Sequence, residues 1–128
     1  MTFKKLNFPI IDFVIVNLYP FEKTINKTSN KEKIIEMIDI GGPALLRSSS
    51  KNFDFLTAIC DPGDYLKLIQ NLDKNNGETS YKFRKKMAFK VFKNTSHYDG
   101  LIFKWLKGTQ RLKNKGKSKK ILLKYGEN

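Results

Sequence analysis

One run of apolar residues constrains the fold of this chain more than any other feature. Residues 10–19 read IIDFVIVNLY, a nearly continuous series of apolar side chains rich in β-branched residues. Such a run is typical of a strand that is buried on both faces, as in a parallel sheet covered by helices. Pro20 cannot donate a hydrogen bond to a neighbouring strand and is expected to end it. The run therefore predicts an interior strand of an α/β domain.

A second, shorter apolar run has the same character. Residues 55–60 read FLTAIC and stop at Asp61-Pro62, a good N-cap followed by proline at the first helical position. Helical spacing or helix-start signals predict further helices at 30–38, after Gly41-Gly42-Pro43 and at 64–72. A turn at residues 75–77 is expected next, followed by a long helix with Thr79 as its candidate cap and an apolar stripe from Phe83 to Trp105. This order predicts an α/β fold with a parallel sheet flanked by helices and one long C-terminal helix. Because two strands make a poor sheet, we expect the chain to be part of a domain.

Length and cysteine content narrow the class of protein. The chain has 128 residues, enough for one small domain. Its single cysteine, Cys60, excludes an internal disulfide framework and a cysteine-based zinc site. Its apolar runs are far shorter than the roughly 20 residues that cross a bilayer, and no signal-type segment opens the chain. We expect a soluble, cytoplasmic domain without membrane contact.

The net charge of +13 lies in one segment. Residues 1–81 hold ten basic and ten acidic side chains, whereas residues 82–128 hold fifteen basic and two acidic ones, a difference of thirteen. Only three of the 25 basic residues are arginine. Arginine is the residue that most often forms bidentate hydrogen bonds with phosphates and base edges. The favoured interpretation is a solvated face, and we do not expect nucleic acid as a partner. Nonspecific attraction to polyanions stays open as an alternative.

A candidate site follows from the order of the elements. Ligands of open α/β sheets bind at the carboxyl ends of the strands. Asn17 and Tyr19 leave the end of the first strand, and Gly41 and Gly42 open a helix whose amides suit an anionic oxygen or a developing oxyanion. Asp39, just before these glycines, is a candidate base or a partner for a cation. The residues alone predict an α/β fragment with a candidate anion site.

Lys51 is the candidate cation of this site, and it lies twelve residues after Asp39. The serines at 48–50 weaken the intervening helix, so the chain is expected to turn back and bring Lys51 near Asp39. Plainer interpretations stand beside these. Asp39 is more often a simple N-cap than a base at such a position, Tyr19 could only mark the end of a strand, and Lys51 is one of many solvated lysines.

Five segments in order carry a resemblance to a known family. They are IDFVIVNLYPFEKT at 11–24, IDIGGPALLRSSSKNF at 38–53, DPGDY at 61–65, RKKMAFKVFKNTSHYD at 84–99 and LKYGEN at 123–128. Together they resemble the bifunctional purine biosynthesis proteins, which combine IMP cyclohydrolase with AICAR transformylase. The resemblance spans nearly the whole chain, and it implies a methylglyoxal-synthase-like α/β domain.

The resemblance also implies a domain division and a reaction. Residues 1–107 would be a partial cyclohydrolase domain, and residues 108–128 a basic linker and the start of the transformylase domain. In the cyclohydrolase step the carboxamide nitrogen of formyl-AICAR attacks the formyl carbon, and water leaves as the ring closes to IMP.

Roles for single residues follow from the same resemblance. Asp39 would take part in proton transfer, Lys51 would complete an acid–base pair with it, and Tyr19 would contact the substrate near the reacting centre. The substrate-binding set would be Asn17, Ile40, Gly41 and Gly42. No metal and no organic cofactor is implied for this step, because 10-formyltetrahydrofolate serves the transformylase domain. The implied partners are a purine nucleotide and, in the complete protein, a second subunit of a homodimer.

Departures from the family pattern shape the expected activity. The family's serine-bearing phosphate loop, its STGG-type turn and its KTLHP segment are absent, and the chain stops before the PHQ that follows LRYGEN. Lys124 stands where the family has arginine. We therefore expect an incomplete cyclohydrolase domain with little or no ring-closing activity alone. The alternatives are a non-catalytic partner that docks on a complementary fragment or an intact homologue, and a polyanion-binding module built on residues 82–128.

Overall fold

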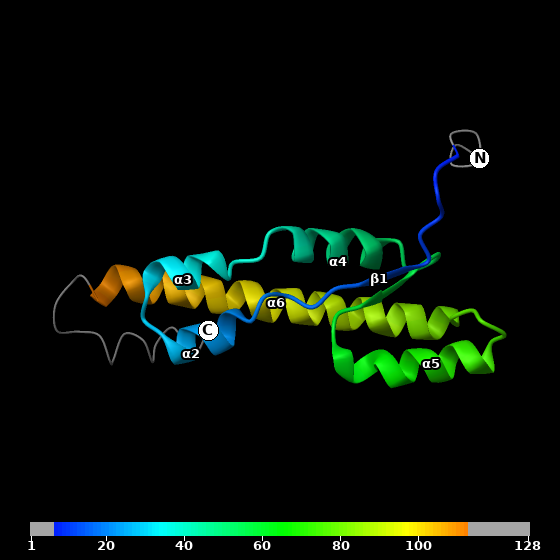
Figure 1. Cartoon of the computed structure of the whole chain (residues 1–128). Helices are drawn as coiled ribbons and strands as arrows, with labels where there is room; N and C mark the ends of the chain where they lie inside the picture. Colours follow the sequence, from blue (N-terminus) through cyan, green and yellow to red (C-terminus); the bar gives the residue numbers. More distant parts are fainter. Residues whose placement is uncertain (1–6, 113–128) are drawn as a thin grey trace. The chain divides into compact units, whose positions relative to one another are not determined.

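A computed structural model describes residues 7–112 of the chain. Its elements, in chain order, are strand β1 (Phe13–Ile15), helices α2 (Phe21–Lys27), α3 (Lys31–Glu36) and α4 (Gly41–Lys51), strand β2 (Thr57–Ile59), the 3-10 turn η1 (Pro62–Asp64), and helices α5 (Tyr65–Lys74) and α6 (Tyr81–Leu112) (Figure 1). The chain divides into two compact units. Within the described residues, the first unit holds residues 7–19 and Asp39–Asn94, and the second holds Pro20–Ile38 and residues 95–112.

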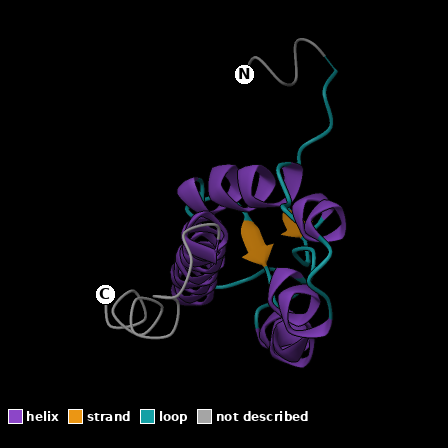
Figure 2. Cartoon of the chain, turned by 90° about the vertical axis from the view of Figure 1, so that its left-hand side faces the viewer, coloured by secondary structure: helices purple, strands orange, loops and turns teal. Residues whose placement is uncertain are grey.

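The sheet of the first unit consists of β1 and β2. The strands are parallel, with Phe13 opposite Thr57, Val14 opposite Ala58 and Ile15 opposite Ile59. The predicted α/β class, with a parallel sheet flanked by helices and a long C-terminal helix, is thereby confirmed (Figure 2). Both strands are only three residues long, shorter than the apolar runs that contain them.

Helices cover the two faces of the sheet unequally. On one face Ala58 packs in a core cluster with Leu46 of α4 and Val91 of α6, joined by the half-buried Val16 and Leu18. On the other face Ile59 packs with Leu68 of α5 and Met87 of α6. Side chains alternate between faces along a strand, so this pattern buries β2 on both sides.

The expectation that the first strand is buried on both faces is wrong. Phe13 and Ile15 are 40% and 49% exposed, although their register partners Thr57 and Ile59 are fully buried. Val14, which points to the α4 face, is half-buried. The second face of β1 stays open because the cluster formed by α5 and α6 centres on β2.

Capping residues set several helix starts. Asn30 caps α3 by accepting from the N–H of Lys33, and Asp61 caps η1 by accepting from that of Gly63, the latter as predicted. The predicted cap of the long helix, Thr79, is wrong by one residue, since Ser80 accepts the N–H of Phe83.

The hydroxyl of Thr79 is engaged elsewhere. It lies 2.8 Å from the hydroxyl of Thr57, a contact that joins the start of β2 to the segment before α6. Just before it, the expected turn at residues 75–77 is confirmed, with positive φ angles of 56° at Asn76 and 85° at Gly77.

Aromatic packing holds the second unit together. Phe21 of α2 is 1% exposed and meets the rings of Tyr98 and Trp105 edge-on, at centroid distances of 6.1 and 6.0 Å. The hydroxyl of Tyr98 donates to the carbonyl oxygen of Met37 at 2.5 Å, and Ile34 of α3 is also buried. Helix α2 was not expected, because its seven residues FEKTINK offer too few apolar positions to show a period.

The predicted C-terminal segment, residues 108–128, lies partly outside the described residues. Residues 108–112, the start of the predicted linker, continue α6. The rest of that linker and the LKYGEN segment lie at 113–128, beyond the described range. Of the helices within residues 7–112, none has the length and apolar character needed to cross a membrane.

Candidate functional site

The candidate site lies at the carboxyl end of β1, where the chain leaves the first unit and returns to it. The sheet pairing extends one residue past β1, because the N–H of Val16 donates to the carbonyl oxygen of Ile59 at 3.0 Å. The chain then runs through Asn17 to Tyr19, passes into the second unit, and re-enters the first at Asp39. This return places Asp39 beside the end of β1, as the order of elements predicts.

Asp39 joins the end of β1 to the start of α4. Its Oδ2 accepts the backbone N–H of Tyr19 at 3.1 Å, and its Oδ1 accepts that of Gly42 at 2.8 Å. Asp39 thus has the simple capping role that the sequence allowed, through the N–H of Gly42. It also has a second hydrogen bond, to the N–H of Tyr19 after β1. Two backbone donors on one short side chain fix the position of the carboxylate.

The backbone around Asp39 is open to a ligand. Ile40 is 78% exposed, and the Cβ position of Gly41 has no heavy atom within 4 Å. A ligand could therefore approach the first turn of α4 closely, where the positive end of the helix dipole favours oxygen atoms with negative charge.

Two further predicted residues follow the end of β1. Tyr19 is 54% exposed and Asn17 is exposed as well. The structure thus brings Tyr19, Asp39 and Gly42 into direct hydrogen bonding. Asn17, Ile40 and Gly41 are their near neighbours in sequence.

Lys51 is not part of this group. The expected turn back at residues 48–50 is wrong, because the serines continue α4 to Lys51. Gly41 and Lys51 are the first and last of 11 helical residues, so they lie about 15 Å apart along the helix axis. The serines are tolerated because the Ser49 hydroxyl donates to backbone carbonyl oxygens one turn earlier, including that of Leu45 at 2.8 Å. Lys51 is exposed at the far end of α4 from Asp39.

A second charged group, which sequence reasoning missed, follows β2. The side chain of Asp64 is 2% exposed and lies 2.5 Å from Nζ of Lys90 in α6, with Nζ of Lys67 at 3.7 Å. The hydrogen bond to Asp64 raises the pKa of Lys90 above its ordinary value. The pair ties η1 to α6 inside the first unit.

Cys60 lies beside this pair, directly after β2. The thiol is half-buried, and this burial raises its pKa, while a hydrogen bond with Asn94 acts in the opposite direction. A thiol with a raised pKa is a poor nucleophile near neutral pH. We therefore assign Cys60 to the core of this region.

A sequence signal for the Asp64–Lys90 pair existed. Asp64 lies in the DPGDY segment, which carried the resemblance but received no role. Lys90 directly precedes Val91 of the apolar stripe of α6, so it stands on the flank of that stripe. A carboxylate in a turn and a lysine at such a flank are candidates for a buried ion pair. As to metals, residues 7–112 hold no group of three or more His, Cys, Asp or Glu side chains that could bind one.

Comparisons with known proteins show the family to which the chain is similar. The family model described as "AICARFT/IMPCHase bienzyme" matches residues 49–128. The chain is 50% identical over 119 residues to "Bifunctional purine biosynthesis protein PurH" of Trichormus variabilis, covering 92% of this chain and 23% of that protein. It is 46% identical over 125 residues to the protein of the same name from Persephonella marina, covering 92% and 24%. The chain thus spans about a quarter of the length of these curated relatives.

A solved structure is similar as well. It is titled "Crystal structure of ForH" and superposes with a TM-score of 0.63 at 29% sequence identity, covering 77% of this chain and 51% of that one. This likeness extends over most of the described residues.

Proposed function

Because this chain belongs to the AICARFT/IMPCHase bienzyme family, we propose that it acts in purine biosynthesis and supplies part of an IMP cyclohydrolase site. In that reaction the carboxamide nitrogen of formyl-AICAR forms a bond to the formyl carbon and loses one proton, and the formamide nitrogen loses its proton as the C=N bond of the ring forms. The formyl oxygen takes up protons and leaves as water. A group that accepts and returns a proton beside the reacting nitrogen would serve both halves of the step.

The observation that carries this proposal is the fixed carboxylate of Asp39. It is held by the N–H groups of Tyr19 and Gly42, at the carboxyl end of β1 and next to open backbone at Gly41. An aspartate carboxylate accepts hydrogen bonds and can also take up a proton, which is the capacity that a proton-transfer group needs. We assign proton transfer to Asp39, and holding of the purine base to the backbone of residues 40–42.

The other assignments rest on the resemblance. Tyr19 would contact the substrate near the reacting centre, with Asn17 beside it. Lys51 keeps a substrate role only at the far end of α4, since the described geometry does not pair it with Asp39. The ring closure would need neither a metal nor an organic cofactor. The partners would be a purine nucleotide and, in the complete protein, a second subunit.

An NMR titration tests the nucleotide site. Addition of IMP at millimolar concentration to the 128-residue chain is expected to shift the amide signals of Tyr19, Ile40, Gly41 and Gly42. Asp39→Asn should weaken these shifts. Lys85→Gln, on the exposed surface of α6, is the matched control and should leave them unchanged. Shifts scattered over other residues, or none at saturating nucleotide, would refute the site.

A ring-closure assay tests the activity of the chain alone. We expect little or no conversion of formyl-AICAR to IMP, because the phosphate loop and further basic residues of the family are absent. Conversion that disappears in Asp39→Asn would overturn this expectation and show that the chain carries the complete chemistry.

A second candidate function is docking, and the open face of β1 favours it. The apolar side chains of this face are Ile11 (61% exposed), Phe13 and Ile15. The side of β1 away from β2 has no partner strand among the residues described. Such an edge recruits strands, so we propose as occupant a complementary fragment of the same family. A monomeric, cooperatively folding chain in ultracentrifugation and thermal melting would count against docking. For polyanion binding, nothing observed in residues 7–112 adds support.

A further inference from the structure

Two adjacent glycines at the start of α4 differ in the space around them. A Cβ built on Gly41 would meet no heavy atom within 4 Å. A Cβ on Gly42 would lie 2.7 Å from Oδ2, 2.8 Å from Oδ1 and 2.9 Å from Cγ of Asp39. Carbon and oxygen atoms that are not bonded do not approach so closely, so any side chain at 42 displaces a neighbour. At 41, a side chain has room.

The neighbour that must move is the carboxylate of Asp39. It lies over the Cβ position of Gly42 because its two oxygens accept the N–H groups of Gly42 and Tyr19. Aspartate has a short side chain with only two torsions, so rotation that clears the Cβ also breaks this double acceptance. The backbone of Gly42 cannot retreat instead without disturbing the first turn of α4.

We propose that Gly42 is a positioning residue for Asp39: its missing side chain leaves the space in which the carboxylate spans from α4 to Tyr19. This inference rests on the proposed function for its catalytic meaning, since it concerns the group assigned to proton transfer. The positioning itself is a property of the chain alone. Proton transfer needs a group within hydrogen-bond reach, and displacement by about 1 Å can lower a rate by about 100-fold.

The test compares Gly42→Ala with Gly41→Ala by NMR on the 128-residue chain. In Gly42→Ala the amide proton of Tyr19 is expected to shift upfield and to show a steeper temperature dependence, because it loses its carboxylate acceptor. The Asp39 carboxyl carbon should shift as well. Gly41→Ala, the matched control, should leave both signals in place. An unchanged Tyr19 amide in Gly42→Ala would overturn the proposal.

A double variant keeps the test decisive if Gly42→Ala folds poorly. With Asp39→Ala already in place the clash is gone, so adding Gly42→Ala should cause no further loss in the urea midpoint. Alanine is in fact the better helix former, so a small gain is expected. An equal loss in both backgrounds would show that Gly42 matters for another reason.

The two hypotheses fail in different ways. If IMP leaves the amides of the wild-type chain unmoved, the proposed nucleotide site fails while Gly42 can still position Asp39. If the Tyr19 amide is indifferent to Gly42→Ala, the positioning role fails whatever IMP does.

Discussion

The two strands of the sheet are equal in length and paired in register, yet they differ in burial. All three residues of β2 are buried, whereas β1 is half-buried at Val14 and exposed at Phe13 and Ile15. The apolar run that contains β1 is the longer of the two, so the apolar content of a strand does not fix its burial. Burial depends on which neighbours the chain supplies. Here helices cover both faces of β2 and one face of β1.

The largest expected difference between the strands comes from a matched pair of truncations. Ile59→Ala removes a fully buried side chain and should lower the free energy of unfolding by about 3 kcal/mol. Ile15→Ala, at the register partner that is 49% exposed, should cost less than about 1 kcal/mol. Urea unfolding measures both. Equal losses would mean that the open face of β1 is covered in solution, which sedimentation would show as self-association.

The charged group that follows β2 should have the next largest effect. Lys90→Met leaves the carboxylate of Asp64 buried without its closest cation, and we expect a loss of about 2 kcal/mol. The loss should fall below that of a fully buried pair, because Lys90 is 31% exposed and Lys67 stays near Asp64. Lys93→Met, at an exposed position on α6, is the control and should change little. If the two variants unfold at the same urea concentration, the ion pair contributes nothing.

Alkaline pH should lower the free energy of unfolding through two groups near β2, Cys60 and Lys90. The pKa of Cys60 is raised by burial, so the folded chain keeps the thiol proton at a pH where the unfolded chain has lost it. The associated stability is full below about pH 9.0 and is lost as pH rises through the folded-state pKa. The raised pKa of Lys90 has the same sign and acts above about pH 10.5.

Comparison of variants separates these two contributions. Cys60→Ala should show a smaller decline in unfolding free energy than wild type where the thiol titrates, and Lys90→Met a smaller decline at higher pH. Urea unfolding across the alkaline range is the measurement. A Cys60→Ala variant whose pH dependence matches that of wild type would exclude the thiol as a cause.

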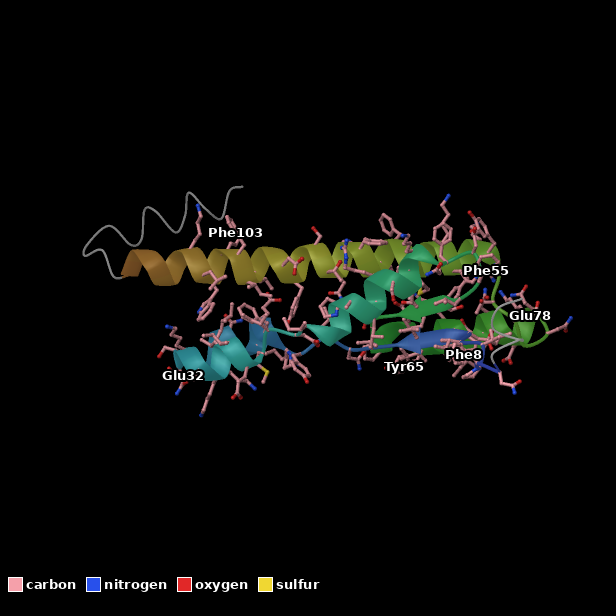
Figure 3. All side chains as sticks on the ribbon, turned by 90° about the horizontal axis from the view of Figure 1, so that it is seen from above. Phe8, Glu32, Phe55, Tyr65, Glu78 and Phe103 are labelled. Carbon is pink, nitrogen blue, oxygen red and sulfur yellow. The ribbon has the colours of Figure 1, made fainter. Side chains whose placement is uncertain are left out.

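The smallest effect on stability is expected at an exposed apolar side chain in the loop before β2. Phe55→Ser changes a side chain that is 82% exposed in the loop before β2, near one end of the first unit (Figure 3), and should alter stability by no more than about 0.5 kcal/mol. Phe55 lines an apolar pocket with Ile10 and Ile11, so its removal should still reduce any concentration-dependent association. A large loss of stability would show that this face is already part of a packed interior.

Sequence patterns predicted the positions of the strands and of the long helix better than they predicted which residues are buried. The apolar runs located both strands, and the stripe from Phe83 to Trp105 located α6, with Met87 and Val91 buried as part of it. Helix α2 was missed because its apolar surface is small. Burial of β1 was overestimated because a strand's sequence does not show whether a second layer of helices will reach it.

In the candidate site, contacts between residues close in sequence were predicted, and contacts that depend on the packing of separate elements were not. Neighbours along the chain were placed correctly, because Asp39 and Gly42 belong to one helix start. Lys51 was misplaced because the serines of α4 satisfy their hydroxyls on the helix's own carbonyl oxygens instead of breaking it. The Asp64–Lys90 contact joins residues 26 positions apart, and such a pair emerges only when two elements pack.

The hydrogen bond between Tyr19 and Asp39 has a consequence for how this family can vary. It ties together the two ends of residues 20–38, which leave the first unit and return to it. In a flexible loop tied at its base, a doubling of length costs only about 0.6 kcal/mol in closure entropy. The turns around α2 and α3 can therefore change in length at small cost, whereas the helices keep Phe21 and Ile34 in the core, and the carboxylate at the base stays in register with the sheet.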